Sequence, residues 1–313
     1  MLYCVRKLLR KTSVAKPCNN TERIEHRGIH MNRSESRVCV ITGAGSGIGA
    51  GLARQALRQG MRVVGADVDT KGLQELTDSA GENSGQLTTR ALDVTDPDAV
   101  ANFAEWVYSK YGKVNLLFNN AGVLVDGKCW ERPLRDWRWI IDVNLMGVVH
   151  GLHHFVPRML QQGEAARIIN TASIGGLLGG GTFMSPYQTT KHAVAVLTES
   201  LYKELAQEPG DVTASVLCPA EVATRIWHSD RLRPADQQVK LGAAEQAFHD
   251  VVANNVAMGP SPDEFAAQVF WGIEDGLFWL IPDTAFMPML EARTAEIAQQ
   301  RNPDINTRVD FDR

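Results

Sequence analysis

The sequence predicts one α/β domain in which helices cover both faces of a doubly wound parallel sheet, in a three-layer αβα arrangement. Short apolar segments alternate with longer helical patterns from Arg37 onward, and no low-complexity linker or internal repeat divides them. Alternating strands and helices of this kind form right-handed βαβ crossovers, which make the strands parallel. The chain has 313 residues, 44% of them hydrophobic, which is enough to bury a sizeable core.

The expected strands are short apolar runs, and the expected helices fill the gaps between them. Seven runs are expected to form strands, at residues 38–42, 62–66, 87–92, 116–119, 167–171, 212–217 and 277–281. The helical patterns between them include residues 47–59, 97–111, 134–161, 187–206 and 263–275.

A glycine-rich turn follows the first expected strand in the stretch VCVITGAGSGIGAGLA, residues 38–53. Its pattern is T-G-x-x-x-G-x-G, and the residues expected to face a cofactor are Gly43, Ser46, Gly47, Ile48 and Gly49. Glycine has no Cβ atom, so the backbone can approach a pyrophosphate, and the next helix offers unpaired N–H groups at its N-terminus. No Gly-Lys-Ser/Thr closes the loop, which excludes a P-loop. The turn favours a dinucleotide site, although tight strand-to-helix turns use glycine anyway.

Asp67 follows the second expected strand, eighteen residues after Gly49, near the ~20 residues typical of the acid that binds an adenosine ribose. A carboxylate there accepts hydrogen bonds from the ribose hydroxyls and repels a 2′-phosphate. Neither Ser46 nor Val68 supplies a cation for such a phosphate. The sequence therefore predicts a Rossmann-type fold that binds NAD in preference to NADP, and an ordinary strand-end acid is the alternative.

Tyr187 and Lys191 lie four residues apart in SPYQTTKHAV, so a helix places them on one face, one turn apart. In most proteins such a pair is an ordinary surface pair. Downstream of a dinucleotide loop, it is suited to move the proton of an alcohol while the cofactor carries the hydride. The ordinary pKa of tyrosine is ~10, and we expect the Lys191 ammonium and the nicotinamide ring to lower it.

Several motifs occur in an order that is far more specific than any one of them: TGAGSGIG (42–49), LDVTD (92–96), NNAG (119–122), VNLMG with Asn144, NTASIGG with Ser173, YQTTK (187–191) and CPAEVAT (218–224). With this set the sequence resembles the classical short-chain dehydrogenases/reductases from Arg37 to the C-terminal region. The resemblance implies an oxidoreductase that interconverts a secondary alcohol and a ketone. It implies the catalytic residues Asn144, Ser173, Tyr187 and Lys191.

The resemblance also implies a role for each residue. Ser173 would bind the substrate oxygen, and Asn144 would bind a water that links Lys191 to solvent. The cofactor-binding residues would be Asp93 and Val94 near adenine, Asn120, Ala121 and Gly122 near the adenosine, Tyr187 and Lys191 at the nicotinamide side, and Pro219, Val222 and Thr224 near the carboxamide. NNAG has an alternative role in stabilising the central sheet. The sequence departs from the family's Pro-Gly by having Ala220 after Pro219, which casts doubt on the local backbone geometry.

Two segments are expected to enclose the substrate. A lid at about 222–262 contributes Ile226, Trp227, Leu232, Phe248, Val256 and Met258, and the opposite wall contributes Leu177, Leu178, Phe183 and Met184. The aromatic run CWERPLRDWRWI (129–140) fits either a substrate wall or buried packing. These residues favour an apolar or aromatic secondary alcohol or ketone over a sugar or a polar acid.

The stretches VNLMGVVHGLHHFVPRML, DRLRP and GIEDGLFWLIPD resemble bacterial dehydrogenases that oxidise the benzylic alcohol of lignin-derived aryl ethers. A steroid or terpenoid alcohol remains an alternative substrate. Two alternative functions also remain: a reductase or epimerase reaction in the same site, and a catalytically silent NAD-binding protein of the same fold.

Composition and charge exclude several other functions. The net charge is −4 with scattered basic residues, which argues against a nucleic-acid surface, and no apolar run approaches the ~20 residues of a membrane span. The five cysteines are odd in number and widely spaced, as in reduced cytoplasmic proteins. Three histidines at helical spacing lack a further ligand, so no metal is expected; they are His150, His153 and His154. The family resemblance implies a homodimer or homotetramer.

Residues 1–31 differ from the rest of the chain, and the domain is expected to span 32–313. The first eighteen residues are basic and lack acids, which resembles a mitochondrial presequence. A disordered tail, or a natural start at Met31, is the alternative interpretation.

Overall fold

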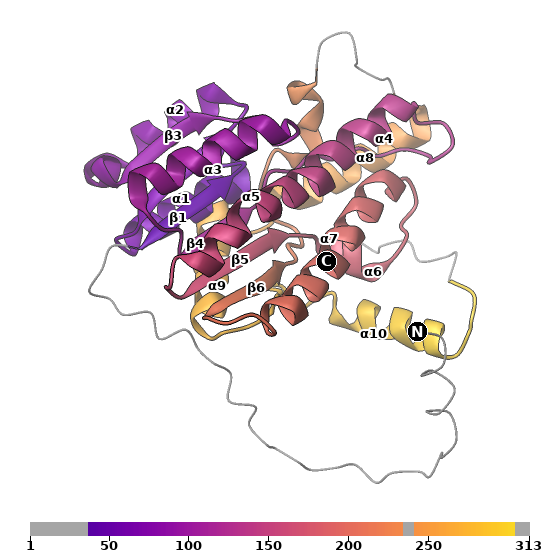
Figure 1. Cartoon of the computed structure of the whole chain (residues 1–313). Helices are drawn as coiled ribbons and strands as arrows, with labels where there is room; N and C mark the ends of the chain where they lie inside the picture. Colours follow the sequence, from indigo (N-terminus) through magenta and orange to yellow (C-terminus); the bar gives the residue numbers. More distant parts are fainter. Residues whose placement is uncertain (1–36, 234–240, 304–313) are drawn as a thin grey trace, which may run out of the picture.

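The computed structural model describes residues 37–233 and 241–303, which form one seven-stranded parallel sheet between two layers of helices (Figure 1). The strands lie in the order β3-β2-β1-β4-β5-β6-β7. They span Val38–Thr42 (β1), Arg62–Asp67 (β2), Leu87–Ala91 (β3), Leu116–Asn119 (β4), Ala166–Thr171 (β5), Val212–Leu217 (β6) and Trp279–Leu280 (β7). The predicted Rossmann-type, three-layer fold is confirmed. The expected extension at residues 1–31 lies outside the described residues.

Helices cover both faces of the sheet and create two separate cores. They include Gly47–Arg58 (α1), Thr70–Ser79 (α2), Pro97–Tyr111 (α3), Gly147–Gln161 (α5), Ser185–Leu205 (α7) and Pro262–Glu274 (α9). All of β1 is buried, as expected for a central parallel strand. Because side chains alternate along a strand, Cys39 and Ile41 pack with α1, α2 and α9 on one face. Val38 and Val40 pack with α3, α5 and α7 on the other.

The predicted helix over 134–161 contains an irregular turn. It consists of α4 (Leu134–Ile141) and α5, joined by the π-helical turn η3 (Asp142–Met146). The last predicted strand, 277–281, shortens to the two residues of β7. No helix within the described ranges is long and apolar enough to cross a membrane.

Besides the 3-10 helix at Gly81–Gln86, five described helices lie outside the helical ranges named from the sequence, and two of them enclose the site. The lid after β6 carries a 3-10 helix, η4 (Ile226–Leu232), and α8 (Ala243–Ala257), so its described part is largely helical. Residues 234–240, between these elements, lie outside the description. The others are α2, the short α6 (Ile174–Leu178) and α10 (Met287–Ala298).

The carboxyl ends of β1 and β4 meet where the strand order reverses, which is where open α/β sheets bind ligands. Asn120, directly after β4, donates from Nδ2 to the Thr42 carbonyl oxygen at 3.0 Å. Thr171 at the end of β5 donates from Oγ1 to Asn120 Oδ1 at 3.3 Å. These bonds hold three strand ends together beneath the site.

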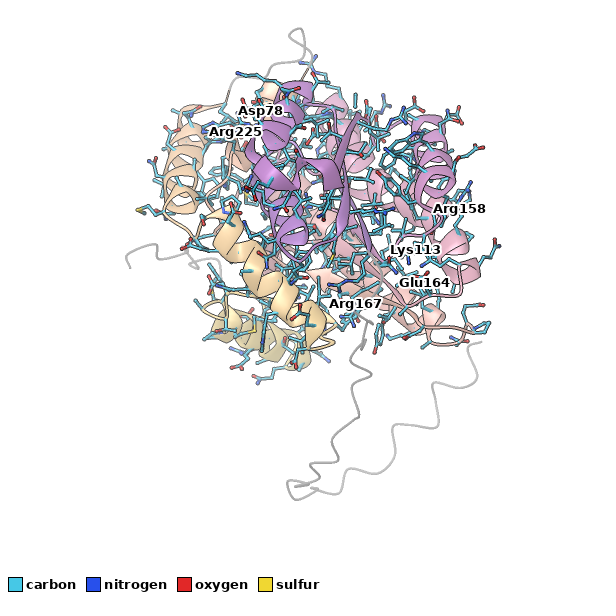
Figure 2. All side chains as sticks on the ribbon, turned by 90° about the vertical axis from the view of Figure 1, so that its left-hand side faces the viewer. Asp78, Lys113, Arg158, Glu164, Arg167 and Arg225 are labelled. Atoms are coloured by element: carbon cyan, nitrogen blue, oxygen red, sulfur yellow. The ribbon has the colours of Figure 1, made fainter. Side chains whose placement is uncertain are left out.

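Polar contacts also stabilise the other end of the sheet, where β4 and β5 begin. The Lys113 ammonium lies 3.0 Å from a Glu164 carboxylate oxygen, between the segments that lead into β4 and β5. Arg167 on β5 donates from Nη1 to Ser215 Oγ at 3.2 Å. Lys113, Glu164 and Arg167 lie far from Arg225, which begins the lid (Figure 2).

Candidate active site

A cavity of about 1060 Å³ opens at the carboxyl ends of the strands. Its lining includes every predicted site residue except Asn144: Gly43, Ser46, Gly47, Ile48, Gly49, Asp67, Asp93, Val94, Asn120, Ala121, Gly122, Ser173, Tyr187, Lys191, Pro219, Val222 and Thr224. Predicted site residues up to 181 positions apart in the sequence therefore face one volume, as a long dinucleotide and a substrate require.

The glycine-rich turn fits a phosphate group. Gly47 has a φ of +52°, and a Cβ atom there would lie 3.1 Å from Thr224 Cγ2, so both backbone and space favour glycine. Ser46 precedes α1, but its side chain makes no capping hydrogen bond. The first N–H groups of α1 and the positive end of its dipole therefore stay available to an anion.

Asp67 is fixed beside that turn by backbone donors. Its Oδ2 accepts from the Gly45 N–H at 2.8 Å, and its Oδ1 accepts from the Asp69 N–H at 2.9 Å. Burial raises the pKa of the Asp67 carboxyl, and these two N–H groups oppose that rise. A carboxylate offers about four acceptor directions, so the two bonds leave room for ribose hydroxyls.

Arg231, on η4 of the lid, is a cavity residue that the sequence did not reveal. Its Nη2 lies 3.4 Å from Ser46 Oγ. Burial lowers the pKa of its guanidinium, whereas attraction to Asp69 and Asp67 raises it. A cation for a 2′-phosphate was expected only in the glycine turn or directly after Asp67, whereas Arg231 comes from a distant segment.

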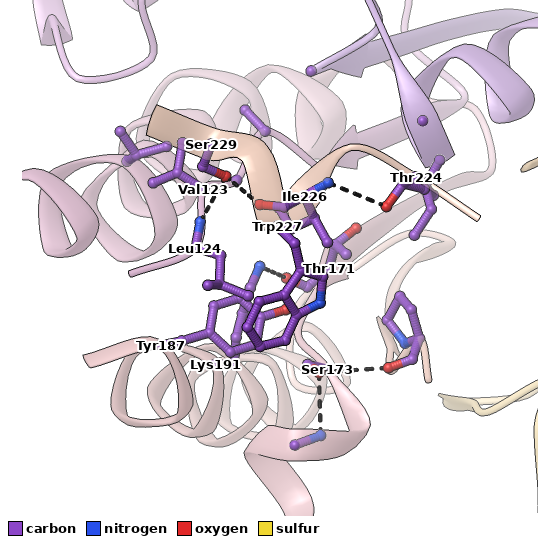
Figure 3. Close-up of a pocket in the computed structure, with 18 of the residues that line it drawn as sticks. Val123, Leu124, Thr171, Ser173, Tyr187, Lys191, Thr224, Ile226, Trp227 and Ser229 are labelled. Carbon is purple, nitrogen blue, oxygen red and sulfur yellow. Dashed lines mark hydrogen bonds between the residues drawn. The ribbon is translucent and has the colours of Figure 1, made fainter. Parts of the chain in front are cut away.

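Three of the predicted catalytic residues meet on one wall of the cavity (Figure 3). Tyr187 and Lys191 lie one turn apart on α7, with Lys191 Nζ 5.8 Å from the centre of the tyrosine ring. Ser173 caps α6, where its Oγ accepts from the Gly175 N–H at 3.1 Å and donates to the Pro219 carbonyl oxygen at 3.5 Å. Lys191 Nζ donates to the Thr171 carbonyl oxygen at 2.8 Å.

The expected lowering of the tyrosine pKa is not produced by the protein groups alone. Burial raises the pKa of the Tyr187 phenol, and the Ser173 hydroxyl offsets only part of this rise. Burial also lowers the pKa of Lys191 to about 8. Desolvation is therefore the largest cause of both shifts, and it acts against the lowering of the tyrosine pKa that was expected from Lys191.

Asn144 lies behind the cavity, in the π-helical turn, and is fully buried. Its Oδ1 accepts from the Val123 N–H at 2.8 Å, and its Nδ2 donates to the Val123 carbonyl at 2.9 Å and to Thr190 Oγ1 at 3.1 Å. A Cβ atom on Gly122 would lie 3.3 Å from Lys191 Nζ and 3.4 Å from Asn144 Oδ1. Glycine thus lets the segment after β4 pass between these two polar groups.

The NNAG stretch divides between the two roles considered. Asn119 donates from Nδ2 to Asn170 Oδ1 at 2.9 Å inside the sheet and does not line the cavity, which fits the sheet-stabilising role. Asn120 faces the cavity, as do Ala121 and Gly122. Ala220 causes no strain, because it is not among the described residues with positive φ.

The remaining walls are mostly apolar, and only part of the expected set forms them. Of the lid residues, Ile226, Trp227, Leu232, Phe248 and Val256 line the cavity, together with Leu178 and Met184 from the opposite wall. The other three expected residues do not: Leu177 is buried in the core, the Phe183 ring packs on Phe248, and Met258 is 77% exposed.

Other wall residues were not predicted as such. Leu124 follows β4, Val252 lies on α8, and Phe286 comes from the chain after β7. The aromatic run also divides, because Trp139 lines the cavity while Trp130 is 76% exposed. A helical period would have indicated Val252, which is four residues from both Phe248 and Val256, but nothing local distinguishes Phe286.

Comparison with known proteins decides the family. The family model described as short chain dehydrogenase matches residues 37–235. The chain belongs to this family. The resemblance drawn from the sequence motifs is therefore confirmed, and the protein is an oxidoreductase by family membership.

Individual relatives cover most of the chain. A CLA biosynthesis dehydrogenase/reductase from Lactiplantibacillus plantarum is 31% identical over 284 residues, covering 88% of this chain and 98% of that protein. A C alpha-dehydrogenase from Sphingobium sp. (strain NBRC 103272 / SYK-6) is 32% identical over 260 residues, covering 80% and 82%. A solved short chain dehydrogenase/reductase from Burkholderia phymatum, in complex with NAD, is 37% identical with a TM-score of 0.83, covering 88% and 98%.

Proposed function

We propose that this short-chain dehydrogenase interconverts a secondary alcohol and a ketone on an apolar substrate, with NAD as its cofactor. The observation that carries the proposal is the shared wall of Ser173, Tyr187 and Lys191 in a cavity with mostly apolar surroundings. A polar proton-transfer group facing an apolar chamber suits a substrate with one reacting oxygen and an apolar body.

In the proposed mechanism the protein handles the proton and the substrate oxygen. Ser173 and Tyr187 bind that oxygen by hydrogen bonds, and in the oxidation Tyr187 takes the hydroxyl proton as the C–H hydride leaves. Bound NAD supplies the hydride acceptor. Lys191, held by the Thr171 carbonyl, stands next in line to exchange the proton, because its pKa of about 8 is close to neutrality. The water relay through Asn144 stays a prediction.

The NAD preference rests on Asp67, whose carboxylate faces the cavity beside the glycine-rich turn. The relative from Burkholderia phymatum in complex with NAD gives it independent support. Arg231 near Ser46 is the feature that opposes it. Fluorescence titration with NADH and NADPH tests the assignment, and tighter binding of NADPH would refute it.

The substrate is proposed to be an aryl-substituted secondary alcohol, with steroid and terpenoid alcohols as rivals. The similarity to a C alpha-dehydrogenase and the aromatic side chains Trp139, Trp227 and Phe248 favour the aryl class. A panel of aryl, steroid and terpenoid alcohols with NAD, followed by NADH absorbance, separates the three. We further propose a homo-oligomer, as the family resemblance implies, which light scattering will test.

Tyr187→Phe tests the catalytic assignment. The variant removes only the hydroxyl that moves the proton, so turnover should fall by about 10²-fold or more while NADH binding is retained. Tyr202→Phe is the matched control, because Tyr202 lies on the same helix, is 44% exposed and does not line the cavity. Unchanged turnover of Tyr187→Phe would favour another base, and no turnover by the native protein with any substrate would favour a silent NAD-binding protein.

A further inference from the structure

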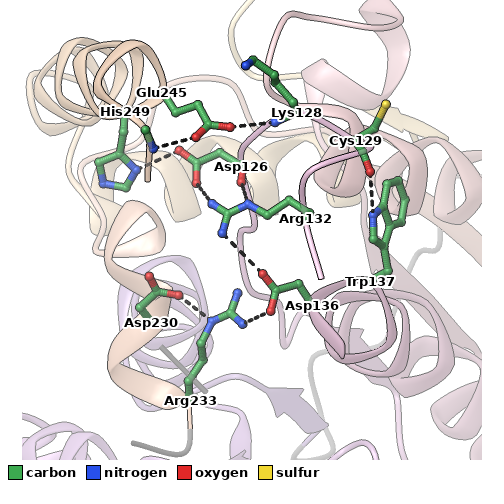
Figure 4. Close-up of polar contacts among 11 residues, drawn as sticks. Asp126, Lys128, Cys129, Arg132, Asp136, Trp137, Asp230, Arg233, Glu245 and His249 are labelled. Carbon is green, nitrogen blue, oxygen red and sulfur yellow. Dashed lines mark hydrogen bonds and ion pairs between the residues drawn. The ribbon is translucent and has the colours of Figure 1, made fainter. Parts of the chain in front are cut away.

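Charged groups are buried where the lid meets the body of the domain (Figure 4). The Asp136 carboxylate, in the first turn of α4, is completely buried and lies 2.6 Å from Arg233 Nη1 and 3.4 Å from Arg132 Nη1. The Arg233 side chain, directly after η4, is only 3% exposed, and its guanidinium lies over the Trp139 ring at 4.2 Å. A cation of the lid is therefore inserted into the body.

A second set of contacts joins α8 of the lid to the same region. Asp126 Oδ1 lies 3.4 Å from Arg132 Nη2, and Asp126 Oδ2 lies 2.9 Å from His249 Nδ1. Glu245 accepts from the Lys128 N–H at 2.9 Å, and this donor together with the Gly242 N–H lowers the pKa of the Glu245 carboxyl. The segment from Asp126 to Asp136 thus contacts both described elements of the lid.

The anchored elements carry the substrate wall. Trp227 and Ser229 lie on η4, and Ser229 Oγ accepts from the Leu124 N–H at 2.9 Å while it donates to the Ile226 carbonyl. The Trp227 ring contacts the rings of Phe248 and His249 on α8, at centroid distances of 6.2 and 5.3 Å. Trp227, Ser229 and Phe248 line the cavity, whereas the residues of the ion pairs do not.

A buried ion pair is a poor way to gain stability, because the desolvation of both charges offsets their attraction, and apolar residues of similar size often do as well. Its distinctive property is geometric, since a guanidinium and a carboxylate bond only in a defined arrangement. Displacing η4 would separate Arg233 from Asp136 and leave a buried charge poorly paired. The pair therefore favours a single position of this end of the lid.

We infer that Arg233 and Asp136 are positioning residues for substrate selection, which hold Trp227 and its neighbours over the reacting groups before a substrate arrives. Neither residue lines the cavity. Their effect on the substrate is therefore exerted through the lid, and the inference rests on the proposed function because it assigns this lid to the substrate chamber.

Hydrogen exchange of the cofactor-free protein tests the positioning without any assumption about the reaction. In Arg233→Met, peptides over 226–233 and 243–257 should exchange about tenfold faster, while peptides of the central strands keep their protection. Asp230→Asn is the matched control, because it removes the other ionic partner of Arg233, which is 59% exposed. Its effect should stay within about twofold, as for surface pairs. Unchanged exchange in Arg233→Met would overturn the inference.

Steady-state kinetics with an alcohol that the native protein oxidises tests the role of Arg233 and Asp136 in substrate selection. Arg233→Met should raise KM by about tenfold with kcat nearly unchanged, because the loss falls on substrate binding. Asp136→Asn, which keeps its shape and an acceptor, should change KM in the same direction by less and serves if Arg233→Met does not fold. Glu164→Gln weakens the remote ion pair with Lys113 and should leave KM unchanged. If kcat falls as KM rises, and Glu164→Gln has the same effect, the ion pair between Arg233 and Asp136 contributes only to stability.

The two experiments separate failure of the inference from failure of the proposed function. Faster lid exchange with an unchanged KM overturns the role in selection. If the native protein oxidises no alcohol of the panel, the proposed function fails, and the exchange experiment still decides whether Arg233 and Asp136 position the lid.

Discussion

Replacing Lys191 by methionine should make the protein more stable at neutral pH while abolishing its activity. Lys191 is 3% exposed, and burial lowers its pKa from 10.5 to about 8. A shift of that size corresponds to roughly 3–4 kcal/mol of unfavourable desolvation for the ammonium in the folded state. The bond from Nζ to the Thr171 carbonyl returns about 1.5–3 kcal/mol. Lys191→Met should therefore raise the free energy of unfolding at pH 7 by roughly 0.5–2 kcal/mol.

The gain must disappear at alkaline pH. Because the pKa is lower in the folded state, the native protein loses the Lys191 proton near pH 8, whereas the unfolded chain keeps it up to about 10.5. Between these values the unfolded state binds more protons, so the stability of the native sequence rises by up to about 1.4 kcal/mol per pH unit. Methionine cannot titrate, so the variant loses its advantage somewhere between about pH 8 and pH 9.5 and is the less stable protein above that range.

Urea unfolding of the cofactor-free protein from pH 6.5 to 9.5, followed by tryptophan fluorescence, measures this difference. Lys203→Met is the control, because Lys203 is an exposed lysine on the same helix. Its pH dependence should match that of the native sequence. If the stability of Lys191→Met shows the same pH dependence as that of the native protein, Lys191 does not have a lowered pKa in the folded state. If it keeps its turnover, Lys191 has no part in the proton transfer.

Two predictions concern the cofactor. Gly47→Ala should weaken NADH binding by about tenfold or more and reduce stability by about 1 kcal/mol, because φ at this position is positive and the Cβ would crowd Thr224. Gly60→Ala is its control, with a φ of +76° but no atom near the added Cβ, so it should lose stability and keep NADH binding in the same titrations. Asp67→Ala should shift the NADH/NADPH affinity ratio towards NADPH, and adding Arg231→Ala should reverse part of that shift if this lid cation binds the 2′-phosphate. An unchanged ratio in Asp67→Ala would remove the basis for NAD preference.

The fold and the cofactor side of the site could be predicted because their signals are local. The glycine turn, Asp67 and the Tyr187–Lys191 pair each depend on a strand end or a helical period, and the parallel sheet brings such strand ends together. The direction of the Tyr187 pKa shift could not be predicted, because desolvation depends on packing from several segments. The ion pair between Arg233 of the lid and Asp136 could not be predicted either, since the two residues are 97 positions apart.

The π-helical turn changes which faces the long helix presents before and after it. One extra residue in a turn rotates everything beyond it by about 100° around the helix axis, because an α-helix has 3.6 residues per turn. The turn at Asp142–Met146 therefore lets one continuous helix present two unrelated faces. Before the turn, Asp136 faces the lid, and beyond it α5 packs on the sheet. A regular helix through this stretch would direct one of these two faces elsewhere. The π-helical turn that contains Asn144 therefore also sets the rotation of Asp136, which pairs with Arg233, relative to the face of α5 in the core.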